Sequence, residues 1–133
     1  MATSSSPGAP GPRLVSILKQ GSYLVASIHT VLSDSELLRF QADLVAQNGE
    51  LRSRGVVIDV AALDVMDSFG TQAICNLARM AKLRGAETVI VGVHPEVAIA
   101  IVALGLELDS VHTALGLEDG LALLEGLVGR GVS

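Results

Sequence analysis

Hydrophobic and polar positions along this chain follow two alternating spacings, which predict strands and helices in turn. Short runs rich in β-branched residues are typical of strands, and apolar residues three or four positions apart are typical of helices. The first pattern predicts strands at 14–19, 23–29, 56–60, 88–93 and 111–113. The second predicts helices at 33–49, 68–85, 95–105 and 117–127. The expected order is therefore β-β-α-β-α-β-α-β-α.

Residues at the ends of these segments support the assignment. Gly21 separates the first two runs, as in a hairpin, and Ser33 and Glu36 have the spacing of a capping box. Gly85 suits the end of the second helix, and Pro95 suits the first position of the third. Alternating strands and helices predict an α/β fold with a mostly parallel sheet, which the opening hairpin makes mixed.

Length and composition suit one domain with an aliphatic core. The chain has 133 residues, half of them hydrophobic, yet only one Tyr, two Phe and no Trp. Residues 1–12 are Ser, Gly, Pro and Ala in low-complexity order, so we expect a disordered tail, a domain at 13–128 and a C-terminal tail at 129–133. The longest apolar run, 97–106, is too short to span a membrane. We therefore expect a cytoplasmic protein without a signal peptide.

Charge and potential ligands argue against several classes of function. A net charge of -5 is unfavourable for nucleic-acid binding, and the few charged residues leave apolar surface for self-association. Cys75 is the only cysteine, so no disulfide forms within the chain, and His29, His94 and His112 lack the spacing of zinc ligands. The glycine loops that bind nucleotide phosphates are absent. We expect no metal and no cofactor.

The segment Asp67-Ser68-Phe69-Gly70 stands where a loop enters the second helix. It lacks the glycine that precedes the serine in a hydrolase nucleophile elbow, and Asp67 would oppose the oxyanion of acyl transfer. We therefore predict no catalytic residue and no enzyme, with a serine hydrolase as a remote alternative. Ser68 suits the N-cap of the helix, and a cap is also an exposed hydroxyl at the positive end of the helix dipole, where a phosphate is tolerated.

The stretch 55–70 resembles the signature of STAS domains, the family of bacterial anti-sigma-factor antagonists. An apolar strand that ends in Asp59 leads to an Asp-Ser pair at a helix start. The resemblance implies that a partner kinase phosphorylates Ser68, with Asp59, Asp67, Phe69 and Gly70 as supporting residues. Many members have a second serine where this chain has Phe69, which either packs under the helix or lies on a docking surface.

Further segments resemble the RsbS type, the small STAS subunits of stressosomes: 17–19, 24–28, 83–86, 92–98 and 112–115. This resemblance implies a scaffold that co-assembles with larger sensor-bearing subunits of the RsbR type. It also implies that the scaffold holds a switch kinase of the RsbT type and releases it on phosphorylation of Ser68, and that a phosphatase resets the serine. With no Ser or Thr between Thr88 and Ser110, one main site is expected.

Two other functions and one docking hypothesis accompany this interpretation. The chain could be a free antagonist that binds an anti-sigma kinase while Ser68 is unmodified. The cytosolic part of an anion transporter is disfavoured because the chain has no spanning segment. The polar residues Gln72, Asn76 and Arg79 keep helical spacing after Ser68, and we expect the kinase to dock there, although such a stripe is also typical of a solvated helix face.

Overall fold

A five-stranded sheet forms the centre of the structure, a computed structural model that describes residues 14–63, 66–103 and 111–132. The strands are β1 (Val15–Gln20), β2 (Tyr23–Ile28), β3 (Gly55–Asp59), β4 (Glu87–Val91) and β5 (Val111–Ala114). They lie side by side in chain order. β1 is antiparallel to β2, and every other pair is parallel. The predicted mixed, mostly parallel sheet is confirmed.

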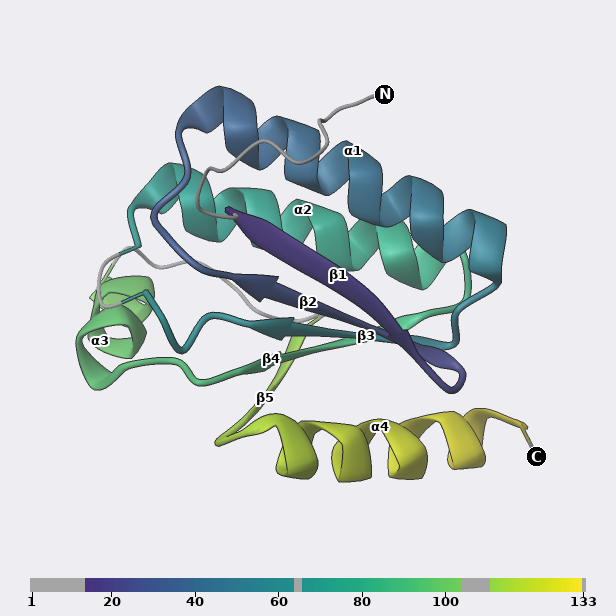
Figure 1. Ribbon diagram of the computed structural model, residues 1–133. Helices are drawn as coiled ribbons and strands as arrows, with labels where there is room; N and C mark the ends of the chain where they lie inside the picture. The colour runs from purple at the N-terminus through teal and green to yellow at the C-terminus, as the bar shows by residue number, and fades with distance from the viewer. Residues whose placement is uncertain (1–13, 64–65, 104–110, 133) are drawn as a thin grey trace.

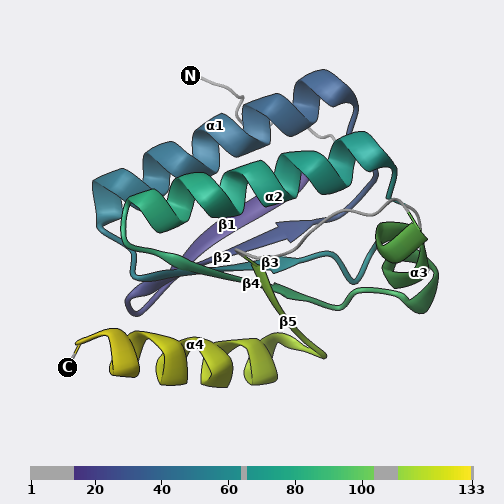
Figure 2. The ribbon, with the colours of Figure 1, turned by 180° about the vertical axis from the view of Figure 1, so that it is seen from behind.

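Two layers of helices cover the sheet (Figures 1 and 2). They are α1 (Asp34–Leu51), α2 (Ser68–Leu83), α3 (Pro95–Ala103) and α4 (Leu117–Val132). α1 and α2 lie over one face, α4 lies over the other, and α3 sits at one end of the sheet. Each helix follows a strand of the parallel set, so all four begin at the end where β2 to β5 finish, the left of Figure 1. We call this the carboxyl end of the sheet and the opposite end the amino end.

Side chains alternate between the two faces of the sheet, as strand geometry requires. On β2 and β3, Leu24, Ala26, Val56 and Ile58 join the core under α1 and α2. Their neighbours Val25 and Val57 pack with Val89, Val91 and Leu124 under α4. Burying a side chain of this size contributes roughly 1.5–3 kcal/mol, so the two aliphatic layers together are the main source of stability.

The expected strand limits agree with the structure to within two residues. The capping box of α1 is also confirmed: the Ser33 hydroxyl accepts the N–H of Glu36 at 3.2 Å, and the Glu36 carboxylate accepts the N–H of Ser33 at 2.7 Å. The last helix continues to Val132, so residues 129–132, which we expected in a tail, are helical. The expected N-terminal tail 1–12 and the end of the third helix at Gly105 lie outside the described residues. None of the helices in the described ranges has the length and apolar character that a membrane crossing requires.

Candidate functional site

Ser68 is the first residue of α2 and lies at the carboxyl end of the sheet. Its side chain is exposed. No hydrogen-bond partner of its hydroxyl is found among the residues that the structure describes.

Asp67, and not Ser68, caps α2. The Asp67 carboxylate accepts the N–H of Gly70 at 2.8 Å, and its main-chain oxygen accepts the N–H and the hydroxyl of Thr71, each at 3.0 Å. The backbone of Asp67 is still extended (φ -84°, ψ 178°), and helical geometry begins one residue later. The interpretation of Ser68 as the N-cap is therefore wrong, because its hydroxyl lies inside the first turn and is not needed for capping.

The residues that follow Ser68 have different surroundings. Gly70 is buried, and a Cβ there would lie 3.3 Å from both the Asp67 carboxylate and the Met66 side chain. Glycine at position 70 therefore leaves room for the Asp67 carboxylate that caps α2. Phe69 is 39% exposed, so it is not buried under the start of the helix.

The loop that leads from β3 to Ser68 is held at Ala61 by the end of β3 and by the segment between β4 and α3. At its start, the Asp59 carboxylate accepts the N–H of Ala61 at 2.9 Å. Nε2 of His94, from the segment between β4 and α3, lies 2.7 Å from the carbonyl oxygen of Ala61. Because a carbonyl oxygen can only accept, Nε2 carries the hydrogen. Gly92 lies so close to Ala61 that a Cβ at position 92 would be 2.7 Å from the Ala61 Cβ. The printed contact of the Asp59 carboxylate is with the loop at Ala61 and not with Ser68.

Four helix dipoles direct their positive ends to the carboxyl end of the sheet. The first turn of α1 contains Asp34 and Glu36, that of α3 contains Glu96, and that of α4 contains Glu118 and Asp119. The first turn of α2 has no acidic residue. A phosphate on Ser68 would gain roughly 0.3–1 kcal/mol from the dipole, opposed by the adjacent Asp67 carboxylate.

Gln72, Asn76 and Arg79 share one exposed face of α2, as expected. The side-chain amide of Gln72 donates to Oδ1 of Asn76 at 3.3 Å, and the guanidinium of Arg79 donates to the same oxygen at 3.2 Å. The four-residue step from Ser68 to Gln72 keeps the serine on this face. The structure thus brings together the predicted phosphate acceptor and the predicted docking residues.

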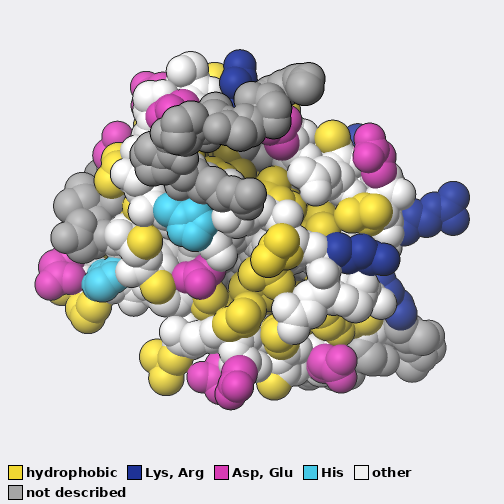
Figure 3. Space-filling model, viewed as in Figure 1, with side chains coloured by type: hydrophobic (Ala, Val, Ile, Leu, Met, Phe, Trp, Pro, Cys, Tyr) yellow, Lys and Arg dark blue, Asp and Glu magenta, His cyan; other side chains and the backbone are white. Residues whose placement is uncertain are grey.

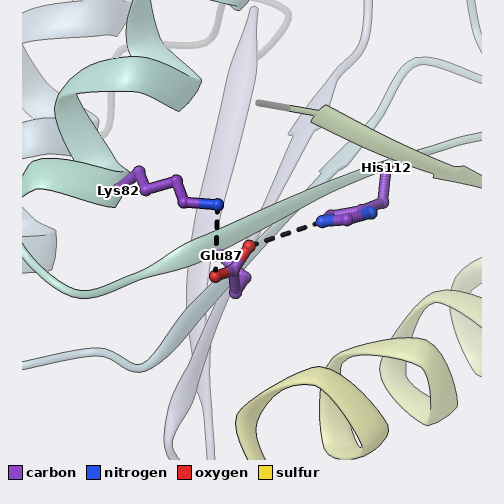
Figure 4. Close-up of polar contacts among 3 residues, drawn as sticks. All are labelled: Lys82, Glu87 and His112. Carbon is purple, nitrogen blue, oxygen red and sulfur yellow. Dashed lines mark hydrogen bonds and ion pairs between the residues drawn. The ribbon is translucent and has the colours of Figure 1, made fainter. Parts of the chain in front are cut away.

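The remaining candidate groups lie apart from Ser68. His29 shares a hydrogen bond with the Ser16 hydroxyl at 2.9 Å, and His112 lies 3.4 Å from the Glu87 carboxylate. Lys82 approaches the other oxygen of that carboxylate at 3.8 Å, at the amino end of the sheet (Figure 4). No described histidine contacts Ser68, and no group of three His, Cys, Asp or Glu residues in the described parts of the chain could hold a metal ion.

Cys75 is a core residue of α2. Its side chain is 3% exposed, and burial raises the pKa of the thiol. Both properties disfavour the thiolate, so Cys75 is unsuited to act as a nucleophile.

Comparison with protein families matches residues 15–120 to the profile described as the STAS domain. The chain belongs to the STAS domain family. The match extends from β1 into the start of α4, so the whole sheet of this STAS domain is included.

Two solved structures are similar over most of this STAS domain. A serine-to-glutamate variant of RsbS from Moorella thermoacetica is 36% identical, with a TM-score of 0.77 over 86% of this chain and 97% of that one. A chain in a structure of the stressosome, a signal integration and transduction hub, is 38% identical, with a TM-score of 0.74 over 84% of this chain and 97% of that one.

A curated relative, the RsbT co-antagonist protein RsbRA of Bacillus subtilis (strain 168), is 34% identical over 70 residues. That alignment covers 53% of this chain but 26% of RsbRA, so the chain matches about a quarter of this larger relative. The chain is thus a STAS domain related to stressosome proteins of the RsbS and RsbR types.

Sequence reasoning missed the capping role of Asp67 and the support that His94 and Gly92 give to the loop. The first had a local signal, because Asp is as good an N-cap as Ser and precedes it directly. The second had none, because His94 and Ala61 are 33 positions apart.

Proposed function

We propose that this chain is a non-enzymatic scaffold and antagonist subunit of a stressosome-type assembly. It holds a serine/threonine switch kinase and releases it when the kinase phosphorylates Ser68. The observation that carries the proposal is the exposed Ser68 hydroxyl in the first turn of α2, within a STAS domain similar to RsbS.

The surroundings of Ser68 suit a switch that leaves the fold intact. Asp67 already caps α2, so a phosphate on Ser68 removes no bond of the helix start. Phosphorylation adds about -1.5 to -2 charges beside the Asp67 carboxylate. A like-charge contact across an interface costs several kcal/mol, so the main effect falls on the bound kinase.

The partners follow from the same proposal. Larger subunits of the RsbR type co-assemble with this chain in the cytoplasm, the kinase is of the RsbT type, and a phosphatase resets Ser68. The relatedness to RsbRA supports the first of these partners. The kinase docks on the exposed face that Ser68 shares with Gln72, Asn76 and Arg79, next to the exposed Phe69.

The decisive experiment is phosphorylation of the pure chain by its cognate switch kinase, with the site mapped by mass spectrometry. We expect one phosphate, on Ser68, and none in Ser68→Ala. Ser35→Ala is the matched control, because Ser35 is also an exposed serine in the first turn of a helix. A kinase that is active on another substrate but leaves Ser68 unmodified would refute the switch.

A binding measurement tests the docking face and the kind of partner. Arg79→Glu should weaken kinase binding at least tenfold, whereas Arg54→Glu, a charge reversal at the amino end, should not. Phosphorylated chain should bind less kinase than unmodified chain. Capture of a sigma-binding kinase by a chain that never joins RsbR-type subunits would instead favour the free antagonist.

A further inference from the structure

His94 joins two segments that are far apart in the chain, the start of α3 and the loop that leads from β3 to Ser68. Its Nε2 atom donates to the carbonyl oxygen of Ala61 at 2.7 Å. The main-chain oxygen of His94 accepts the N–H of Ala98 at 3.0 Å, so the same residue also begins α3. One side chain therefore ties the first turn of α3 to the start of the loop.

The main chain around His94 holds the ring in place for this contact. Gly92 has φ +78° and lies so close to Ala61 that a Cβ at position 92 would be 2.9 Å from the main-chain nitrogen of Ala61. Pro95 follows directly and disfavours a helical backbone at residue 94. Because the main chain is fixed on both sides of His94, little conformational freedom is lost when the hydrogen bond forms.

α3 has little other support from the described residues. It sits at one end of the sheet, whereas the other three helices lie across its faces (Figures 1 and 2), and α3 packs extensively on none of the described elements. Val97 of α3 is buried, but Ile99 is 68% exposed. The His94 hydrogen bond and the burial of Val97 therefore provide much of the attachment of α3 that the described residues show.

The segment that His94 holds also packs against the first turn of α2. Val93 and Val97 line a cavity of only about 10 Å³. Met66 and Thr71 line the same cavity. Its volume is at the lower limit for a single water molecule, so side chains fill nearly all the space between α3 and α2. A shift of the α3 segment would therefore be felt by both Met66 and Thr71.

Met66 and Thr71 in turn support the start of α2. The buried Thr71 hydroxyl donates to the main-chain oxygen of Asp67 at 3.0 Å. The Met66 side chain lies against Gly70, whose N–H the Asp67 carboxylate accepts. The Ser68 side chain is itself exposed, so its position is set by the turn that carries it. Packed contacts thus lead without a break from the α3 segment to the turn that presents the serine.

We infer that His94 is a positioning residue for the phosphorylation of Ser68. By holding the α3 segment against the loop, it keeps the contact between α3 and α2 closed and fixes the turn that presents the serine hydroxyl. Transfer of a phosphoryl group needs the acceptor oxygen in a defined place, and a misplacement of about 1 Å can cost up to roughly 10²-fold in rate. The inference rests on the proposed function and adds to it a residue that acts through others.

Three substitutions at position 94 separate the hydrogen bond from the volume of the ring. The amide nitrogen of Gln is as many bonds from Cα as Nε2 of His, so His94→Gln should keep the bond to Ala61. His94→Asn, whose amide nitrogen is one bond closer to Cα, and His94→Leu, which has no donor, should lose it.

His29→Leu is the matched control. His29 also lies at the carboxyl end of the sheet, where histidine side chains reach the surface (Figure 3), but its ring bonds with the Ser16 hydroxyl and not with the loop. This substitution therefore removes a histidine hydrogen bond without releasing the α3 segment.

Steady-state phosphorylation of the full chain by its cognate switch kinase measures the effect, with the site mapped by mass spectrometry. We expect His94→Leu and His94→Asn to lower kcat about tenfold with KM unchanged, and His94→Gln and His29→Leu to remain within about twofold of wild type. A merely structural role would give a different result. Partial unfolding lowers the concentration of competent substrate, so it raises the apparent KM and leaves kcat unchanged.

Amide hydrogen exchange tests the same contact without the kinase. The N–H groups of Gly70 and Thr71 donate to Asp67 at 2.8 and 3.0 Å, so their exchange reports how firmly the first turn of α2 is held. Loss of one hydrogen bond should make this exchange about tenfold faster in His94→Leu. It should remain at the wild-type rate in His94→Gln.

Each outcome has a distinct meaning. An equal kcat in wild type and His94→Leu, or unchanged exchange at Gly70 and Thr71, would overturn the inference and leave the proposed function intact. Failure of His94→Gln to restore both readouts would also overturn it, because the role would then belong to the ring and not to the hydrogen bond. A wild-type chain that an active kinase leaves unmodified at Ser68 would refute the proposed function, and the inference with it.

Discussion

Replacing Asp67 by alanine should destabilise the domain, whereas replacing its neighbour Ser68 should not. The Asp67 carboxylate accepts the N–H of Gly70 at 2.8 Å. Loss of an N-cap costs about 0.5–2 kcal/mol, and the negative charge at the helix start adds roughly 0.3–1 kcal/mol. Asp67 is exposed, so its charge should contribute near the lower end of the range of roughly 0.3–1 kcal/mol. We therefore expect Asp67→Ala to lower the free energy of unfolding by about 1–2 kcal/mol in total.

Two further substitutions separate the bond from the charge. Asp67→Asn keeps an acceptor oxygen and should lose only about 0.3–1 kcal/mol. Ser68→Ala removes a hydroxyl that has no partner among the described residues, so its effect should stay within about 0.5 kcal/mol.

Urea unfolding followed by far-UV circular dichroism at neutral pH measures these differences, provided that the m-value is unchanged. In thermal unfolding, a loss of 1 kcal/mol corresponds to about 3–5 °C for a domain of this size. If Ser68→Ala proved as destabilising as Asp67→Ala, the serine would be the cap, and its hydroxyl would not be free for a kinase.

Three other outcomes test the structure around the site. Gly92 has φ +78° and little space beside Ala61, so Gly92→Ala should lower the free energy of unfolding by about 1–3 kcal/mol in the same assay. Gly116→Ala is the control, because a Cβ at position 116 would have no atom within 4 Å, and it should not cause such a loss. Cys75 should react with a thiol reagent only as fast as the chain unfolds, and rapid labelling of native protein would contradict its burial. The N–H of Ser33 lowers the pKa of Glu36 below the ordinary value of 4.5. The stability advantage of wild type over Glu36→Gln should therefore be present at neutral pH and decline as the pH falls below 4.5, and an advantage independent of pH would contradict the hydrogen bond.

The element order and the cores follow from patterns within short stretches of sequence. The run at 55–59 is uniformly apolar up to Asp59 because both faces of β3 are covered, by α1 and α2 on one side and by α4 on the other. The capping box at Ser33 is equally local, since both of its hydrogen bonds join residues three positions apart. Such features are encoded by spacing alone and were predictable.

Phe69 shows where spacing is insufficient. Its spacing places it on the same side of the helix as Ala73 and Leu77, yet those two residues are buried and Phe69 is 39% exposed. Its neighbours Gly70 and Thr71 in the same turn are buried, so the exposure depends on which side of the first turn faces the core. The site was therefore predictable in its position, and the exposure of Phe69 was not.

From the sequence alone one learns that an Asp-Ser pair starts a helix after a buried strand, because hydrophobic period and capping preference are local properties. The tertiary structure decided which of the two residues is the cap, because that depends on where the incoming loop turns helical. It also decided how His94 and Gly92 hold that loop. These features join residues far apart in the chain, and only the packing of the sheet and its helices brings them together.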